Sequence, residues 1–271
     1  MTKMTSEDFW RAMVEEGIES LHRERWLFRR LPSDPRCKVC SVPFGGFGGR
    51  IMGRFGYEPW IKNPNLCNLC QDIVMERPGG AEVNLSLLFA DVRGSTDLAE
   101  TLSPMKLKQV MSSFYEVATS VLVRTNAFVD KIVADEVVGF YFPAFHGPLH
   151  AGAAIRAADE LIRRAHSEEV LPLGIGVHTG IVYLGTIGGE GGVAADIGVV
   201  GDVVNTTARL ASSAAQGEVF ISEQAHEASD LDLGELERRE LALKGKAEPF
   251  PVRVLTIHSP GPERAERATA A

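Results

Sequence analysis

Hydrophobic positions in the last two thirds of the chain follow two alternating patterns. Short apolar runs at residues 83–92 and 171–180 predict buried strands. Longer segments at residues 103–125 and 147–166 repeat apolar positions three and four apart, which predicts helices. Two β-rich runs between these helices meet at Asp135 and predict a hairpin.

The order of these elements is β-α-β-β-α-β, which is the order of the ferredoxin-like split motif. A further strand is expected at residues 181–188, a helix at 201–215 and a final β-pair at 241–255. The expected fold class is therefore α+β. It has a ferredoxin-like βαββαβ core with added strands, in a domain over residues 85–257.

The first third of the chain has a different character. A Ser or Thr cap predicts a helix, and we assign residues 1–35 to an N-terminal helical segment. Residues 36–74 form a small module around the cysteines, and Pro and Gly in residues 75–84 mark a linker. Residues 258–271 are expected to be a disordered tail.

Composition narrows the class of protein. The chain is 45% hydrophobic and 24% charged, as in an ordinary soluble protein. It has no run approaching the ~18 apolar residues of a membrane helix and no visible secretory signal, so we expect no membrane span and a cytoplasmic location. The net charge of −8 argues against nucleic acid as the main ligand, although residues 23–62 carry nine Lys or Arg against three acids.

All four cysteines lie in the small module, as Cys37, Cys40, Cys67 and Cys70. In a reducing compartment, two C-x-x-C pairs indicate metal ligands before disulfides, because each pair places two thiolates on one ion and two pairs complete a tetrahedral site. A module this small depends on the metal for its stability. Zinc is the expected ion, an iron–sulfur cluster is the alternative, and two purely structural pairs are the third reading.

Two acids occupy comparable places at strand ends. Asp91 ends an apolar strand and Asp135 lies at the tip of the hairpin, and strands one and three of the expected sheet are neighbours. Two carboxylates at one site repel each other unless a cation lies between them. Mg²⁺ or Mn²⁺ prefers such oxygen ligands, so the pair predicts a metal site; two solvated turn acids are the alternative.

One of the later helices carries a second polar pair. Asn205 and Arg209 lie four residues apart and share one face of the helix. An amide beside a guanidinium suits the orientation of a sugar and the stabilisation of charge on a phosphate.

Four segments, in this order and spacing, resemble the catalytic motifs of class III nucleotidyl cyclases: LFADVRGST, DKIVADEVVGFY, GIGVHTGIVYLGTIG and DIGVVGDVVNTTARL. The resemblance covers residues 83–257. It implies the class III cyclase fold and an adenylate cyclase, which converts ATP to 3′,5′-cyclic AMP and pyrophosphate.

The resemblance also implies roles for individual residues. Asp91 and Asp135 match the aspartates that bind two Mg²⁺ or Mn²⁺ ions, and the carbonyl of Val92 matches a further ligand. Asn205 and Arg209 match the pair that stabilises the transition state.

The other matched positions belong to substrate binding. The backbone of Gly94, Ser95 and Thr96 matches the turn that receives the triphosphate. Lys131 matches the lysine that selects the base, and Lys246 matches a lysine that contacts phosphate.

Two positions depart from the family pattern. Gly198 occupies the place of the second base-reading side chain, which leaves the choice between ATP and GTP to Lys131 and backbone contacts. Ala134 stands where a glycine usually precedes the second aspartate. A methyl group is tolerable in a strand, so we expect only a modest effect.

In this family, the metal aspartates and the Asn/Arg pair of one site come from two catalytic domains. Because this chain carries both sets, we expect a symmetric homodimer with two equivalent sites and an inactive monomer. The N-terminal module is then expected to regulate the enzyme. The alternatives are a cyclase of relaxed or guanylate specificity, and a metal- or redox-sensing protein whose cyclase domain binds nucleotide without turnover.

Overall fold

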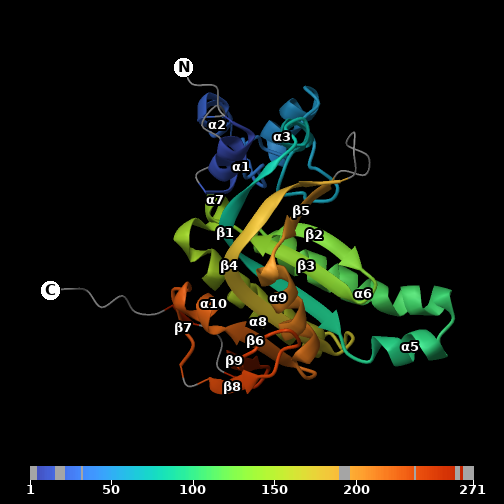
Figure 1. Ribbon diagram of the computed structural model, residues 1–271. Coiled ribbons are helices and arrows are strands. Elements are labelled where there is room, and N and C mark those ends of the chain that lie inside the picture. Colours follow the sequence, from blue (N-terminus) through green and yellow to red (C-terminus); the bar gives the residue numbers. More distant parts are fainter. Residues whose placement is uncertain are drawn as a thin grey trace. The chain divides into compact units, whose positions relative to one another are not determined.

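The computed structural model describes residues 5–15, 22–31, 33–188, 196–234, 236–259 and 263–264. The chain divides into two compact units (Figure 1). The first comprises Met1–Val83, Phe142–Gly147 and Val182–Val200, and the second comprises Asn84–Tyr141, Pro148–Ile181 and Gly201–Ala271. Two long strands, β1 (Gly80–Val92) and β4 (Leu173–Ile187), run from one unit into the other.

Within the described residues, one eight-stranded sheet has the order β2-β3-β1-β4-β6-β9-β8, and β5 pairs with β4 outside this path. The other strands of this sheet are β2 (Phe128–Val133), β3 (Glu136–Tyr141), β5 (Asp196–Val200), β6 (Glu218–Ser222), β8 (Glu237–Leu241) and β9 (Phe250–Thr256). The neighbours β2-β3-β1-β4 stand in the order of a ferredoxin-like core, and β3 is antiparallel to both β2 and β1. The predicted α+β class with this core is confirmed.

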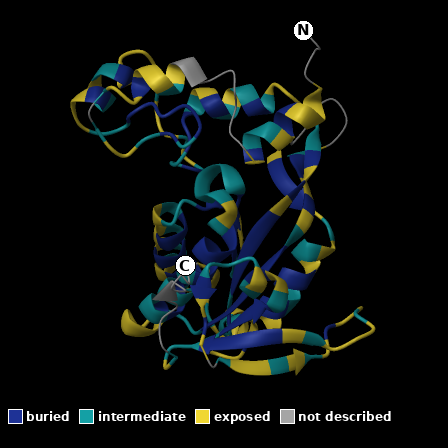
Figure 2. Ribbon diagram, turned by 90° about the vertical axis from the view of Figure 1, so that its left-hand side faces the viewer, coloured by how far each residue is buried: buried dark blue, intermediate teal, exposed yellow. Residues whose placement is uncertain are grey.

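Helices cover both faces of the sheet in the second unit. The larger core joins β1, β3, β4 and β6 to α6 (Pro104–Arg124) and α8 (His150–Ser167). On the opposite face, α9 (Asp202–Ser213) places Leu210 against Phe220 and Val254. Their strand neighbours Val219 and Leu255 belong to the larger core, because successive strand residues point to opposite faces. Figure 2 shows the strands of this sheet largely buried.

The remaining elements of the second unit are short. They are α5 (Ser95–Thr101), α10 (Glu223–Glu227), and the two-residue strands β7 (Leu231–Asp232) and β10 (Glu263–Arg264), which pair with each other. A 3₁₀ turn, Gly147–Leu149, precedes α8.

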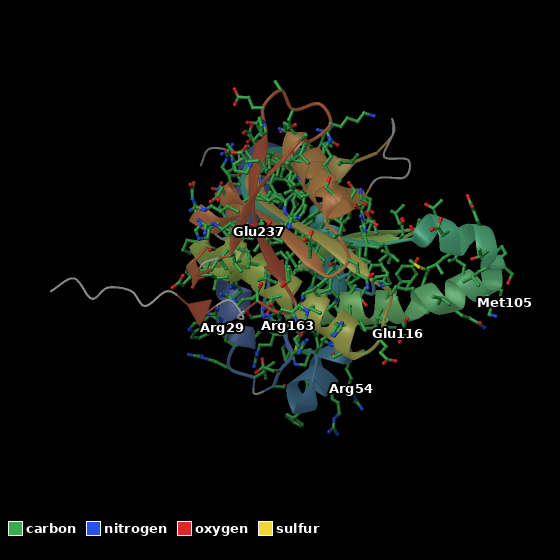
Figure 3. All side chains as sticks on the ribbon, turned by 90° about the horizontal axis from the view of Figure 1, so that it is seen from below. Arg29, Arg54, Met105, Glu116, Arg163 and Glu237 are labelled. Carbon is green, nitrogen blue, oxygen red and sulfur yellow. The ribbon has the colours of Figure 1, made fainter. Side chains whose placement is uncertain are left out.

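The longest helix, α6, follows the predicted pattern. Its buried side chains recur at intervals of three and four, as in Phe114, Ala118 and Val121, while Met105 and Glu116 are exposed (Figure 3). Pro104 occupies the first turn, where a missing N–H costs no hydrogen bond. No helix within the described ranges is both long and apolar enough to span a bilayer.

The first unit contains the N-terminal helices and the cysteine module. Its helices are α1 (Ser6–Glu15), α2 (His22–Phe28), α3 (Gly46–Gly53), α4 (Asn68–Met75) and α7 (Pro143–His146). Thr5 caps α1, because its hydroxyl accepts from the amide of Asp8 (3.1 Å) and the Asp8 carboxylate accepts from the amide of Thr5 (3.1 Å). Phe9 and Trp10 are buried, and α1 packs against α7.

Three parts of the chain differ from the expectations. The strands expected at 171–180 and 181–188 form one continuous strand, β4. Gly180 between them lies within this strand and forms no turn. Its lack of a side chain makes room for α9, because a Cβ there would lie 2.8 Å from the side chain of Val203. Strand β1 begins at Gly80, inside the expected linker 75–84. The expected tail 258–271 falls mostly outside the described residues; residues 258–259 and the short strand β10 are described.

Helix α9 lies directly on β4 at Gly176. A Cβ at this glycine would lie 2.6 Å from both the amide nitrogen of Ala211 and the carbonyl oxygen of Thr207. Because both atoms belong to the helix backbone, no side-chain rotation can make room. Glycine at this position therefore sets how closely α9, with Asn205 and Arg209, approaches the sheet.

We predict that Gly176→Ala lowers the free energy of unfolding by about 1–3 kcal/mol, the usual cost of overpacking a core. Urea denaturation measures the change. Gly53→Ala, at the last residue of α3, is the control, because a Cβ there meets no atom within 4 Å and alanine favours a helix, so the free energy of unfolding should not fall. A Gly176→Ala protein as stable as the wild type would contradict the direct contact.

Candidate functional site

A cluster of three carboxyl groups lies at the C-terminal end of the central strand β1. Asp91 lies directly across from Glu136 in the antiparallel pairing of β1 with β3. The amide of the next residue, Val92, donates to the carbonyl oxygen of Asp135 (3.0 Å). The hairpin therefore brings Asp135 beside Asp91, as the sequence predicted.

The charges of these groups act on one another. Burial raises the pKa of Asp91, and the charge of Asp135 raises it further, while Arg93 opposes both. Burial raises the pKa of Glu136 as well, and the charges of Asp91 and Asp135 add to this effect. A divalent cation would relieve this repulsion, and a set of carboxylate oxygens is what Mg²⁺ and Mn²⁺ prefer. The residues present therefore fit such an ion.

Arg93 is a member of this cluster that the sequence analysis missed. Its guanidinium forms an ion pair with the carboxylate of Asp91 and donates to the carbonyl of Ser212 at the end of α9 (2.6 Å). Arg93 thus links the end of β1 to the helix that carries Asn205 and Arg209. Its position two residues after Asp91 is the signal that could have revealed it, because residues two apart near a strand point to the same side.

The predicted triphosphate turn follows β1 directly. Gly94 has φ +71, in the left-handed region, and begins α5. Ser95 and Thr96 form the first turn of this helix, whose backbone amides have no acceptor within the helix. The hydroxyl of Ser95 donates to the carboxylate of Asp135.

The expected strand position of Ala134 was wrong. Ala134 lies in the tight connection between β2 and β3 with φ +50, not in a strand. A left-handed backbone costs a residue with a Cβ roughly 1–2 kcal/mol more than glycine, so the methyl group strains the turn that presents Asp135. The hydroxyl of Tyr115 on α6 donates to the carbonyl of Ala134 and holds this turn.

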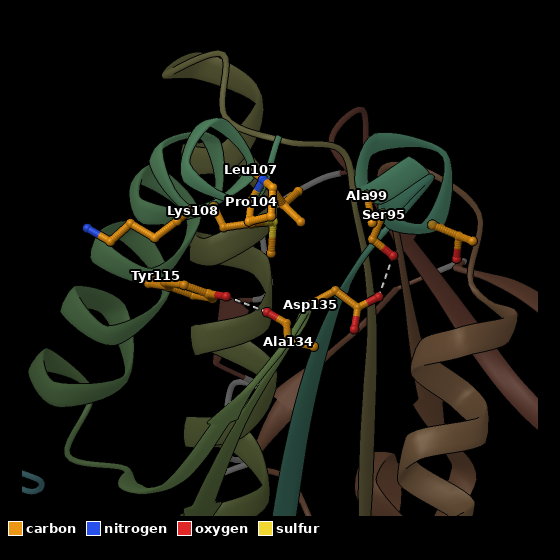
Figure 4. A pocket seen from close by; sticks show the side chains of 10 residues that line it. Ser95, Ala99, Pro104, Leu107, Lys108, Tyr115, Ala134 and Asp135 are labelled. Atoms are coloured by element: carbon orange, nitrogen blue, oxygen red, sulfur yellow. Dashed lines mark hydrogen bonds between the residues drawn. The ribbon is translucent and has the colours of Figure 1, made fainter. Parts of the chain in front are cut away.

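A pocket of about 480 Å³ opens beside this turn (Figure 4). Its walls come from α5, α6 and the β2–β3 connection, and Asp135 and Ser95 lie at one side of it. The lining residues are Ser95, Thr96, Ala99, Pro104, Leu107, Lys108, Met111, Tyr115, Ala134 and Asp135.

The predicted transition-state pair lies in a second group, on α9 and the loop before β9. Asn205 is exposed, and the guanidinium of Arg209 lies against Gly245, within 3.5 Å of the place of a Cβ there. Lys246, the next residue, forms an ion pair with Asp202 at the start of α9. The hydrogen bond from Lys246 lowers the pKa of Asp202. Because Arg209 lies against Gly245, the residue before Lys246, the structure brings Arg209 and Lys246 close together.

Among the described residues, no direct hydrogen bond or ion pair joins Asn205, Arg209 or Lys246 to the carboxylates at the end of β1; the connection from Asp91 to their helix runs through Arg93. The two predicted base-reading positions lie on different strands. Lys131 on β2 is half-exposed and pairs with Asp130 (3.2 Å), and Gly198 on β5 lies opposite Gly185 of β4. Two glycines in register leave that part of β5 without a side chain that reads a base.

The four cysteines lie together as predicted. Cys37 and Cys70 approach to 3.8 Å between sulfurs, Cys40 and Cys67 to 3.7 Å, and all four sulfurs lie within 4.8 Å of one another. These distances are too long for disulfides. They match the ~3.8 Å that separates thiolates placed tetrahedrally about 2.3 Å from one zinc ion.

The four thiols influence one another's ionisation, and backbone amides donate to two of the sulfurs. The amide of Cys67 donates to the sulfur of Cys37 (3.4 Å), and the amide of Cys70 donates to the sulfur of Cys67 (3.4 Å). Hydrogen bonds from the other thiols lower the pKa of Cys37, whereas the contact with Cys37 raises the pKa of Cys40 and of Cys70. The negative charge of one thiolate therefore disfavours ionisation of its neighbours, and a cation is needed for all four cysteines to ionise.

The module contacts β5 within the first unit. Lys62, in the loop between the two cysteine pairs, forms an ion pair with Asp196 at the start of β5 (2.5 Å). This strand carries Gly198 two residues later.

The sequence profile described as "Adenylate and Guanylate cyclase catalytic domain" matches residues 80–254. The chain belongs to this family. The resemblance to class III nucleotidyl cyclases is thus confirmed, and the cyclase domain includes both groups of predicted catalytic residues.

Curated relatives of the cyclase are named for either base. An adenylate cyclase of Anabaena cylindrica is 25% identical over 134 residues, which cover 46% of this chain and 26% of the relative. Guanylate cyclase 32E of Drosophila melanogaster is 26% identical over 175 residues, which cover 60% and 15%. The cyclase chain therefore spans about a quarter or less of the length of these relatives.

The similar solved structures also include both guanylyl and adenylyl cyclases. The guanylyl cyclase Cya2 has a TM-score of 0.59 and 26% identity, over 65% of this chain and 93% of that chain. The adenylyl cyclase CyaB from P. aeruginosa has a TM-score of 0.55 and 22% identity, over 70% and 98%, and shows the shared fold.

We predict that Cys37→Ser lowers the metal content of the purified cyclase, because loss of one of four thiolates opens the coordination shell. Elemental analysis by mass spectrometry measures the metal, and the absorption spectrum separates colourless zinc from a coloured iron–sulfur cluster. Ser41→Ala, which leaves all four thiolates in place, is the control. Wild-type metal content in Cys37→Ser would show that the four sulfurs do not share an ion.

Proposed function

We propose that this chain is an adenylate cyclase that converts ATP to 3′,5′-cyclic AMP and pyrophosphate, at two equivalent sites between two copies of the chain. The observation that carries the proposal is the placement of Asp91, Asp135 and the turn at Ser95 together at one edge of the sheet, in a domain of the cyclase family.

The proposed roles follow from the chemistry of each side chain. Asp91 and Asp135 would hold two Mg²⁺ or Mn²⁺ ions, with the carbonyl of Val92 as a further ligand. When bound, these ions supply positive charge that favours ionisation of the ribose 3′-hydroxyl and neutralises the phosphates. The backbone amides of Ser95 and Thr96 would bind the triphosphate at the start of α5.

The second group of residues would act on the reacting phosphate. The 3′-oxygen attacks the α-phosphorus while the bond to pyrophosphate breaks, so negative charge builds on the α-phosphoryl oxygens. Arg209 would stabilise this charge, and Asn205, one helical turn earlier, would orient the ribose. Lys246 would contact phosphate by sharing its donors between Asp202 and the substrate.

A site shared between two copies is part of the proposal, because this chain carries both the carboxylates and the Asn205–Arg209 pair. A symmetric dimer would bring the carboxylates of one copy to Asn205 and Arg209 of the other, and it would do so twice. Exposed apolar side chains on β2, Ile132 and Val133, support an interface beside Lys131, because such residues gain most from being covered.

We predict that Asp135→Ala and Arg209→Ala are each inactive alone and regain activity when mixed. A statistical mixture holds half heterodimers with one intact site each, so turnover should reach about a quarter of the wild type. Production of cyclic AMP from ATP with Mn²⁺ measures it. A mixture of Asp91→Ala with Asp135→Ala is the control and should stay inactive, since both changes fall in the same group. No recovery in the first mixture would contradict a site built from two copies.

The choice of base is the less constrained part of the proposal. Gly198 offers no side chain, and relatives are named for both adenylate and guanylate activity, which supports a cyclase of relaxed specificity as the second candidate. Lys131 would then carry the preference for ATP.

We predict that Lys131→Ala lowers the ratio of kcat/KM for ATP to that for GTP about 10-fold, the effect of one charge-assisted hydrogen bond. Parallel assays with each nucleotide measure the ratio. Lys106→Ala, an exposed lysine at the start of α6, is the matched control. An unchanged ratio would remove Lys131 from base selection, and nucleotide binding without any product would favour the sensor that lacks turnover.

For the cysteine module we infer a single Zn²⁺. All four sulfurs lie within 4.8 Å of one another, which supports one shared ion, because an iron–sulfur cluster spreads its four thiolates over two or four irons and so places some of them farther apart. The ion pair of Lys62 with Asp196 supports regulation through this module, since it joins the loop between the cysteine pairs to the strand of Gly198.

A further inference from the structure

The turn that carries Asp135 is held from three separate elements. The amide of Val92 on β1 donates to the carbonyl of Asp135 (3.0 Å), and the hydroxyl of Ser95 on α5 donates to its carboxylate. The third bond comes from α6, where the hydroxyl of Tyr115 donates to the carbonyl of Ala134 (Figure 4). Only the last of these bonds acts on the residue that is strained.

Ala134 needs such support because its backbone is left-handed, with φ +50. An alanine released from this conformation moves to the ordinary right-handed or extended regions. Any such rotation of the backbone displaces the next residue, Asp135, from its place beside Asp91. The strain at Ala134 and the position of Asp135 are therefore coupled.

Tyr115 is well placed to hold the turn. Its ring packs against Phe114 (5.6 Å between centroids) and lines the pocket beside Asp135. Burial and the nearby charge of Asp135 raise the pKa of the Tyr115 hydroxyl, so it stays protonated and can donate at neutral pH.

We propose that Tyr115 is a positioning residue for the metal carboxylate Asp135, and that it acts by holding the left-handed turn at Ala134. The inference rests on the proposed function in one respect, the role of Asp135 as a metal ligand. Tyr115 itself touches neither metal nor substrate in this scheme. Its removal should therefore weaken metal binding before it affects any step of the reaction.

The test measures Mn²⁺ binding to the whole chain, residues 1–271, without nucleotide, by electron paramagnetic resonance. The fraction of binding that disappears in Asp135→Asn is assigned to this site. Tyr115→Phe should weaken that fraction roughly 3- to 10-fold, the effect of one neutral hydrogen bond. Wild-type Mn²⁺ affinity in Tyr115→Phe would overturn the proposal.

A second tyrosine provides the matched control. Tyr141 on β3 shares a hydrogen bond with the hydroxyl of Thr125 (2.8 Å), away from the turn. Tyr141→Phe therefore removes a comparable bond from the same unit and should leave Mn²⁺ affinity unchanged. Equal losses of affinity in both variants would indicate general destabilisation and would also overturn the proposal.

Glycine at the strained position gives the decisive comparison. Ala134→Gly adopts the left-handed backbone without a steric cost, so the turn should depend less on Tyr115. In this background, Tyr115→Phe should weaken Mn²⁺ binding less than 2-fold. An undiminished effect of Tyr115→Phe would contradict action through the turn. Because binding is read without nucleotide, an inactive wild-type protein that still binds Mn²⁺ would reject the proposed function and leave this inference intact.

Discussion

The antiparallel pairing of β1 with β3 is the constraint on which the candidate site depends. Its register places Asp91 opposite Glu136 and lets the amide of Val92 bond Asp135. Because the side-chain period of a strand is two residues, a slip of one residue would turn Asp91 toward the other face. The buried apolar residues of both strands prevent such a slip, so packing in the core determines where the carboxylates meet.

Much of the fold could be predicted from the sequence, because hydrophobic periodicity reports directly which face of each element is buried. The β-α-β-β-α-β order needed only this signal. Glycines were harder to interpret. Gly180 and Gly176 belong to a strand and permit close packing against α9, yet a glycine in the sequence reads equally well as a turn. Only the contact with α9, which is distant in the sequence, shows that these glycines belong to a strand and not to a turn.

Some residues of the candidate site could likewise be predicted from the sequence, and others could not. Asp91, Asp135 and the four cysteines could be found because each follows a local spacing rule, and the structure brings the members of each group together. Tyr115 could not be found in this way, because its partner is a backbone carbonyl supplied by another element. Arg93 has a local spacing to Asp91, but its bond to the carbonyl of Ser212 on α9 gives no signal in the sequence. The strain at Ala134 was missed for a related reason, since a one-residue shift in the end of β2 changes a strand position into a turn position.

The first unit is assembled from three separate stretches of chain, ending with Val182–Val200. During synthesis the cysteines leave the ribosome long before these last residues. At about 5–20 residues per second, roughly ten seconds pass between them. The ligands of the proposed zinc site need only Cys37 to Cys70, so metal can be captured in that interval. The nascent chain can therefore bind its metal ion before β5, whose Asp196 forms the ion pair with Lys62, has been synthesised.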